Sequence, residues 1–85
     1  MAQGATVIDV RNPDEYARGA RPGSLNIPLK DLSKALDQQL KDLDKSKPLI
    51  LCCRSGSRSA MAQRILRSAG FIEVINAGPW GNTLD

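Results

Sequence analysis

Two adjacent cysteines and the arginine-, serine- and glycine-rich run after them are the residues most able to do chemistry in this 85-residue chain. A thiolate is a nucleophile, whereas guanidinium groups, hydroxyls and the backbone N–H groups around a glycine all bind anions. The run therefore predicts a cysteine that reacts with, or carries, a small anionic group. Its members are Cys52, Cys53, Arg54, Ser55, Gly56, Ser57, Arg58 and Ser59.

The residues on either side of this run predict a strand, a tight loop and a helix. Residues 49–51 are an apolar run too short for a helix, and Pro48 breaks any helix before it. From Ser59 onward, the composition favours a helix. A cysteine at the carboxyl end of a strand, facing the amino end of a helix, lies where α/β sheets bind ligands and where N–H groups stabilise an anion.

Cys53 is the expected nucleophile of the pair. A free thiol titrates near ~8.5, and a helix N-terminus with neighbouring cations lowers the pKa to roughly 3.5–7.5. Two arginines follow Cys53 closely, and Gly56 accepts the positive φ that turns N–H groups inward. We expect Cys52 to be core filler. We expect Cys53 to be catalytic and its substrate to be bound by Arg54, Ser55, Gly56, Ser57, Arg58 and Ser59, with Ser57 or Ser59 capping the helix.

Composition argues against several other kinds of site. The chain has no histidine, which removes Cys-His and Ser-His-Asp catalysis and most zinc sites, so we expect no metal and no cofactor. The net charge is +3 and no basic run is interleaved with aromatics, which suits a small anionic substrate better than nucleic acid. No apolar stretch approaches the roughly 18 residues of a membrane span.

The cysteines also bear on the compartment. Adjacent strand residues point to opposite faces, a poor geometry for a disulfide, so we expect free thiols. Free thiols favour the cytoplasm. Residues 1–4 lead directly into a strand without a signal peptide, whereas a signal peptide removed beforehand would indicate the periplasm.

The rest of the chain predicts strands that alternate with helices, and therefore one α/β domain over residues 1–85 with a small parallel sheet flanked by helices. Asn12, Pro13 and Glu15 have the residue types of a helix start. We expect strands at 6–10, 24–27, 49–51 and 71–75, a leucine-rich helix at 31–43, and a helix after the cysteine loop that turns Met61, Ile65, Leu66 and Ala69 inward.

Several of these segments together resemble the rhodanese domain, over a core of about residues 6–78. The matching motifs are residues 8–11, 15–16, 22–28, the Cys53 loop, 70–71 and 76–78. The resemblance is to the short single-domain thiosulfate sulfurtransferases. It implies a persulfide on Cys53, formed from thiosulfate and passed to cyanide, a thiol or a sulfur-accepting protein. It also implies a six-residue loop from Cys53 to Arg58, and mainly structural roles for Asp9 and Arg11.

Two alternatives stay open. Read from Cys52, the run fits C-x5-R-S, the loop of cysteine phosphatases and arsenate reductases, although Leu51 stands where that signature usually has histidine. In that case Cys52 would be the nucleophile. The other alternative is a rhodanese-like module that binds or carries sulfur without turnover. Trp80 is expected to cover the sheet end or the mouth of the loop.

Overall fold

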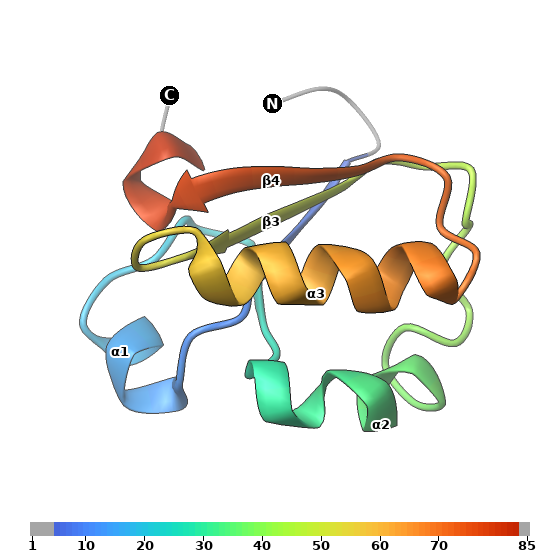
Figure 1. Cartoon of the computed structure of the whole chain (residues 1–85). Coiled ribbons are helices and arrows are strands. Elements are labelled where there is room, and N and C mark those ends of the chain that lie inside the picture. Colours follow the sequence, from blue (N-terminus) through green and yellow to red (C-terminus); the bar gives the residue numbers. More distant parts are fainter. Residues whose placement is uncertain (1–4, 84–85) are drawn as a thin grey trace.

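A four-stranded parallel sheet with helices between consecutive strands forms the frame of the molecule (Figure 1). The computed structural model describes residues 5–83. Its strands are β1 (Thr6–Asp9), β2 (Leu25–Asn26), β3 (Leu49–Cys53) and β4 (Val74–Pro79), arranged in the order β2-β1-β3-β4. The helices are α1 (Pro13–Ala17), η1 (Leu29–Asp31), α2 (Leu32–Leu36), α3 (Ser57–Ser68) and η2 (Trp80–Thr83). The predicted α/β class is confirmed.

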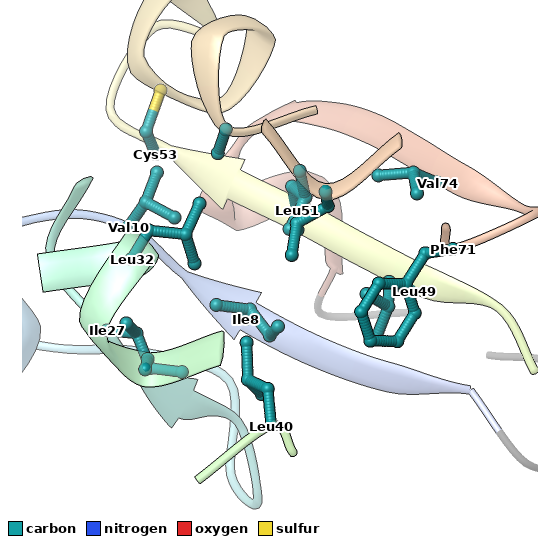
Figure 2. Close-up of a cluster of buried hydrophobic side chains, with 13 residues drawn as sticks. Ile8, Val10, Ile27, Leu32, Leu40, Leu49, Leu51, Cys53, Phe71 and Val74 are labelled. Atoms are coloured by element: carbon teal, nitrogen blue, oxygen red, sulfur yellow. The ribbon is translucent and has the colours of Figure 1, made fainter. Parts of the chain in front are cut away.

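β3 lies in the centre of the sheet, and all five of its residues are buried. Leu49, Leu51 and Cys53 join the larger apolar cluster, which packs against α2 and α3 (Figure 2). Ile50 and Cys52 join a smaller cluster that includes Trp80. Because side chains alternate along a strand, the two neighbouring cysteines end up on opposite faces of the sheet. Both thiols are free, as expected.

The predicted inward face of α3 is partly wrong. Met61 is 58 % exposed, whereas Ser59, Ala62 and Leu66 are the buried residues of this helix. The buried positions are three and four residues apart, so they share one face, and Met61 lies off that face. Small side chains at Ser59 and Ala62 allow the start of α3 to approach the sheet closely. A pattern of large apolar residues alone does not detect such a face.

The last strand also differs from the prediction. β4 runs over Val74–Pro79 instead of 71–75, so Asn76–Gly78 belong to the strand. Phe71 is buried in the larger cluster, and its N–H bonds the carbonyl of Leu66. The pairing of β3 with β4 shifts its register between Leu51 and Cys52, so that Gly78 and not Ala77 pairs with Cys52. This register brings the end of β4 beside the cysteine loop.

The leucine-rich segment forms a shorter helix than the predicted 31–43. α2 ends at Leu36, and hydrogen-bonded turns follow it. Leu40 is nevertheless buried, and its N–H bonds the carbonyl of Ala35, five residues back. The leucine spacing therefore identifies the inward-facing side chains correctly, because turns of similar pitch present the same face as a helix.

The carboxyl ends of β3 and β4 meet the loop before α3, and α1 and η2 lie at this same end of the molecule (Figure 1). In open parallel sheets this is the edge where ligands bind. The lead into the first strand at residues 1–4 and the last two residues of the tail lie outside the described residues. Within the described part of the chain, no helix has both the length and the apolar composition to cross a bilayer.

Candidate active site

The loop between β3 and α3 closes around the sulfur of Cys53. Gly56, with φ of 103°, turns the chain between the strand and the helix. The Gly56 N–H donates to Cys53 Sγ at 2.8 Å, and Ser59 Oγ lies 3.5 Å from the same sulfur. A Cβ at position 56 would lie 3.3 Å from the Cα of Gly78 on β4. Both the positive φ and this close approach require glycine, as the sequence predicts for the φ.

The Cys53 thiol combines full burial with a lowered pKa. The residue is 0 % exposed, and this burial by itself raises the pKa. Hydrogen bonds from the Ser59 hydroxyl and from the N–H groups of Ser59, Gly56 and Ser55 outweigh it, so the net shift is downward. The expected thiolate is therefore stabilised mainly by amides and a hydroxyl, and less by the arginines to which the sequence pointed.

The serines of the loop differ in position. Ser59 is buried, and its hydroxyl bonds the Gly56 carbonyl as well as facing Cys53. Ser55 and Ser57 are exposed, with their hydroxyl oxygens 3.3 Å apart. The residue in the N-cap position of α3 is Gly56, so the expectation that Ser57 or Ser59 caps the helix is wrong. A left-handed glycine there leaves the first N–H groups of the helix free to face the sulfur.

Arg58 is held by a partner that lies 43 residues away in the chain, Glu15 of α1. The two guanidinium nitrogens bond the two carboxylate oxygens at 2.7 and 3.1 Å. Arg58 and the N–H of Asn12 lower the pKa of Glu15 to about 2. Sequence spacing does not indicate this contact. Arg58 thus stands beside the loop as half of an ion pair, while Arg54 is exposed and lines an open cavity next to the loop.

Asn76 of β4 is a loop-positioning residue that sequence reasoning did not single out. Its Oδ1 accepts hydrogen bonds from Ser59 Oγ at 2.6 Å and from the Gly78 N–H at 2.9 Å. Its Nδ2 donates to the carbonyl of Gly56 at 3.2 Å. One side chain thus ties the edge strand to two of the residues that surround Cys53. The motif at residues 76–78 contributes to the resemblance but predicts none of these contacts, because they depend on the strand register.

We expect Asn76→Ala to raise the pKa of Cys53. Without the Asn76 amide, the Gly56 carbonyl and the Ser59 hydroxyl each lose a hydrogen-bond partner, and one such bond contributes about 0.5–1.5 kcal/mol. The loop then holds the Cys53 sulfur less firmly, and the fraction of Cys53 present as thiolate at pH 7 falls several-fold. The measurement is the rate of alkylation by iodoacetamide against pH, in a Cys52→Ala background. The parent should titrate below an ordinary thiol, and Asn76→Ala above the parent. Asn82→Ala is the matched control, because within residues 5–83 the Asn82 amide bonds the Ala77 carbonyl and no residue of the Cys53 loop. Equal profiles for all three proteins would contradict this role.

Cys52 lies on the face of the sheet opposite the loop. Its thiol is 3.9 Å from the carbonyl of Ile8 and packs near Trp80. Burial, and then the charge of Asp9, raise its pKa to about 12. A nucleophile of the phosphatase kind must be a thiolate inside the loop. The geometry therefore disfavours the C-x5-R alternative that begins at Cys52.

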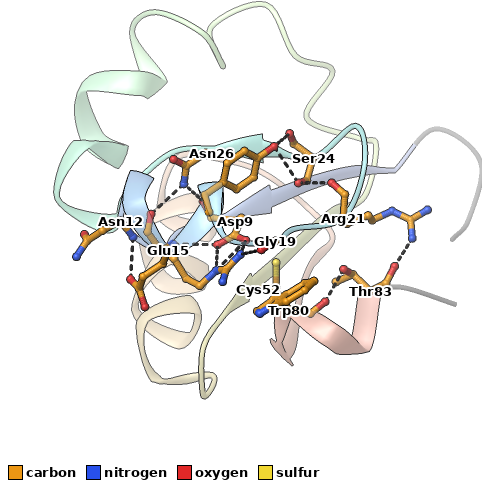
Figure 3. A network of polar contacts seen from close by, with 12 residues as sticks. Asp9, Asn12, Glu15, Gly19, Arg21, Ser24, Asn26, Cys52, Trp80 and Thr83 are labelled. Carbon is orange, nitrogen blue, oxygen red and sulfur yellow. Dashed lines mark hydrogen bonds and ion pairs between the residues drawn. The ribbon is translucent and has the colours of Figure 1, made fainter.

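Arg11 and Asp9 form a buried ion pair at the end of β1, and Figure 3 shows Asp9 beside Gly19, Cys52 and Trp80. Asp9 accepts bonds from the Arg11 Nε at 2.9 and 3.0 Å and from its terminal nitrogen at 2.7 Å. The same terminal nitrogen donates to the Gly19 carbonyl at 2.7 Å. The guanidinium carbon lies 4.9 Å from the centre of the Trp80 ring. Arg11 therefore pairs with Asp9, and Trp80 covers this pair at the sheet end.

No three His, Cys, Asp or Glu side chains in residues 5–83 form a group that could hold a metal ion.

The family model of the rhodanese-like domain matches residues 1–77. The chain belongs to the rhodanese-like domain family. A solved structure described as a rhodanese with anions from E. coli has a TM-score of 0.81 and 32 % identity, and the alignment covers 92 % of this chain and 89 % of that one.

Curated relatives of this rhodanese-like domain include enzymes and a candidate carrier. The thiosulfate sulfurtransferase PspE of Escherichia coli is 35 % identical over 84 % of this chain and 66 % of its own. The human thiosulfate:glutathione sulfurtransferase is 35 % identical over 95 % of this chain and 80 % of its own. YrkF of Bacillus subtilis, a candidate sulfur carrier protein, is 36 % identical over 86 % of this chain, which spans only 37 % of YrkF.

Proposed function

We propose that this rhodanese-like domain is a sulfurtransferase that moves a sulfane sulfur from thiosulfate to cyanide or a thiol through a persulfide on Cys53. The observation that carries the proposal is the Cys53 sulfur held by loop amides, with a lowered pKa, at the carboxyl end of β3. Relatives named as thiosulfate sulfurtransferases add support. No metal or organic cofactor enters the proposal.

In the first half-reaction the Cys53 thiolate attacks the outer sulfur of thiosulfate. A bond forms between Sγ and that sulfur, the sulfur–sulfur bond of thiosulfate breaks, and its electron pair leaves with sulfite. The enzyme keeps an anionic persulfide. The N–H groups of Ser55, Gly56 and Ser59, which already bond the thiolate, are placed to stabilise this charge. Arg54 supplies positive charge at the mouth of the loop, where an anion enters.

In the second half-reaction the acceptor attacks the outer sulfur of the persulfide. Cyanide takes it as thiocyanate, or a thiolate takes it as a new persulfide, and the electron pair of the broken bond returns to Cys53 Sγ. Because Cys53 is 0 % exposed, the loop must open for either reactant to reach the sulfur. The exposed residues Arg54, Ser55 and Ser57 are the part of the loop that can move without disturbing the core.

The test is the mass of the protein after incubation with thiosulfate. A persulfide adds one sulfur atom, and the added mass should disappear on treatment with cyanide while thiocyanate appears. Cys52→Ala should behave like the parent protein. No added sulfur on Cys53 under any donor concentration would refute the proposal.

A non-catalytic sulfur carrier is a second candidate, because the thiol is fully buried and one relative is a candidate sulfur carrier protein. A carrier would take up sulfur as described but release it only to a partner protein. It would therefore show the added mass without repeated turnover on cyanide or small thiols. Steady-state thiocyanate formation separates the two candidates.

A further inference from the structure

The guanidinium of Arg58 already has a carboxylate partner, although it stands on the first turn of α3 beside the Cys53 loop. Its two terminal nitrogens donate to the two oxygens of Glu15 at 2.7 and 3.1 Å. A pair of nitrogens on one edge of a guanidinium is also what binds an oxyanion through two parallel hydrogen bonds. An oxyanion that approaches the loop must therefore compete with Glu15 for this edge of Arg58.

Glu15 is fixed in place by the start of α1. Its Oε1 accepts the backbone N–H of Asn12 at 3.0 Å as well as the bond from Arg58 (Figure 3). The side chains of Arg58 and Glu15 are 31 % and 21 % exposed, so water screens the pair only in part. Arg58 and then the Asn12 N–H lower the pKa of Glu15 to about 2, which keeps the carboxylate charged near neutral pH. The pair therefore persists under the conditions of an assay.

The charges next to the loop are balanced unevenly. An open cavity of about 250 Å³ lies there, and its lining residues are Arg11, Glu15, Arg18, Gly19, Arg54 and Trp80. Within residues 5–83, Arg11 and Arg58 each pair with a carboxylate, whereas neither Arg18 nor Arg54 takes part in a salt bridge. Arg18 and Arg54 thus attract an incoming anion to the cavity, where the arginine of the loop itself is already neutralised.

The groups that hold the sulfur are of a different kind. The N–H groups of Ser55, Gly56 and Ser59 stabilise the charge on one atom, Cys53 Sγ. A tetrahedral oxyanion such as sulfate or phosphate spreads its charge over several oxygens, which match the geometry of a guanidinium. With Arg58 occupied, the loop suits a sulfur anion better than an oxyanion.

We propose that Glu15 is a specificity-determining residue, which occupies Arg58 and thereby keeps sulfate, phosphate and other oxyanions from binding in the Cys53 loop. The inference deepens the proposed function and rests on it, because a bound oxyanion would block the thiolate from its sulfur donor. Thiosulfate reacts through its outer sulfur, so its oxygens need not enter the loop. Glu15 acts through Arg58 and is therefore a positioning residue.

The first test measures oxyanion binding without sulfur transfer. A phosphate ion in the loop shields Cys53 from iodoacetamide, so its affinity is read from the phosphate concentration that halves each protein's own alkylation rate. All proteins carry Cys52→Ala, and sodium chloride holds the ionic strength constant. Glu15→Gln should lower this concentration about fivefold, the effect of one partly exposed ion pair. The glutamine keeps an oxygen for the Asn12 N–H, so α1 should begin as in the parent.

Asp14→Asn is the matched control. It removes the same charge from the neighbouring residue, which is exposed and forms no salt bridge within residues 5–83, so it should bind phosphate like the parent. Glu15→Gln should have no effect in an Arg58→Met background, because the guanidinium that it frees is then missing. A phosphate affinity in Glu15→Gln no higher than in Asp14→Asn, or a gain that persists with Arg58→Met, would overturn the inference.

The second test measures turnover with thiosulfate and cyanide. Sulfate should inhibit Glu15→Gln at about one fifth of the concentration that inhibits the parent to the same degree. Slower turnover of Glu15→Gln with unchanged inhibition by sulfate would show a purely structural role and would also contradict the inference. Thiocyanate formation in the parent protein reports the proposed function separately, since the alkylation test needs no sulfur transfer.

Discussion

Replacing Cys53 by serine will lower the rate of thiocyanate formation from thiosulfate and cyanide by about a thousandfold or more. A serine hydroxyl is not ionised near neutral pH, and it cannot form a persulfide with the donated sulfur. The loop amides that lower the pKa of Cys53 would then face a neutral oxygen. The measurement is the initial rate of thiocyanate production at saturating thiosulfate.

The matched control is Cys52→Ala, the neighbouring cysteine on the other face of the sheet. Its thiol has a pKa raised to about 12 and lies outside the loop, so the variant should keep the parent rate. The phosphatase alternative predicts the reverse order of effects, with Cys52 essential. A Cys53→Ser protein that is folded, by its cooperative thermal unfolding, and still turns over at the parent rate would exclude the persulfide mechanism.

Replacing Asp9 by alanine should cost about 3–5 kcal/mol of unfolding free energy, because it leaves the Arg11 charge buried without its partner. The side chain of Arg11 is only 6 % exposed and that of Asp9 only 1 %. Arg11 also contacts the Gly19 carbonyl and the Trp80 ring, so its displacement would loosen the wall of the cavity. Such a loss is a large part of the ~5–15 kcal/mol by which domains are stable. Urea unfolding at constant pH measures it.

Asp42→Ala is the surface control, since Asp42 is exposed and such changes usually stay within about 0.5 kcal/mol. The double variant Asp9→Leu with Arg11→Met removes both charges and should recover part of the loss, because no buried charge is left unpaired. If Asp9→Ala unfolds at the same urea concentration as Asp42→Ala, the pair does not contribute to stability as argued.

The mistakes in the sequence-based prediction share one cause. The sequence places Met61 inside by its helical spacing with Ile65 and Leu66, and it predicts a strand at residues 71–75 from their apolar and β-branched composition. In the molecule, the start of α3 packs through Ser59 and Ala62, and Phe71 enters the core before β4 begins. In both cases the contact with a neighbouring element overrides the local preference, since burial against that element is worth more than propensity.

What the sequence determined by itself is the local chemistry around Cys53. The strand, the glycine that turns the loop and the helix after it are set by interactions among residues a few positions apart, so periodicity and turn chemistry predict them. Only the tertiary structure decided which groups surround that thiol. Glu15 reaches Arg58, Asn76 reaches Ser59, and Trp80 lines one cavity together with Arg18 and Arg54, because the parallel sheet brings the ends of separate strands to one edge. Contacts between segments so far apart in the chain leave no mark in local spacing, because strand order and register create them.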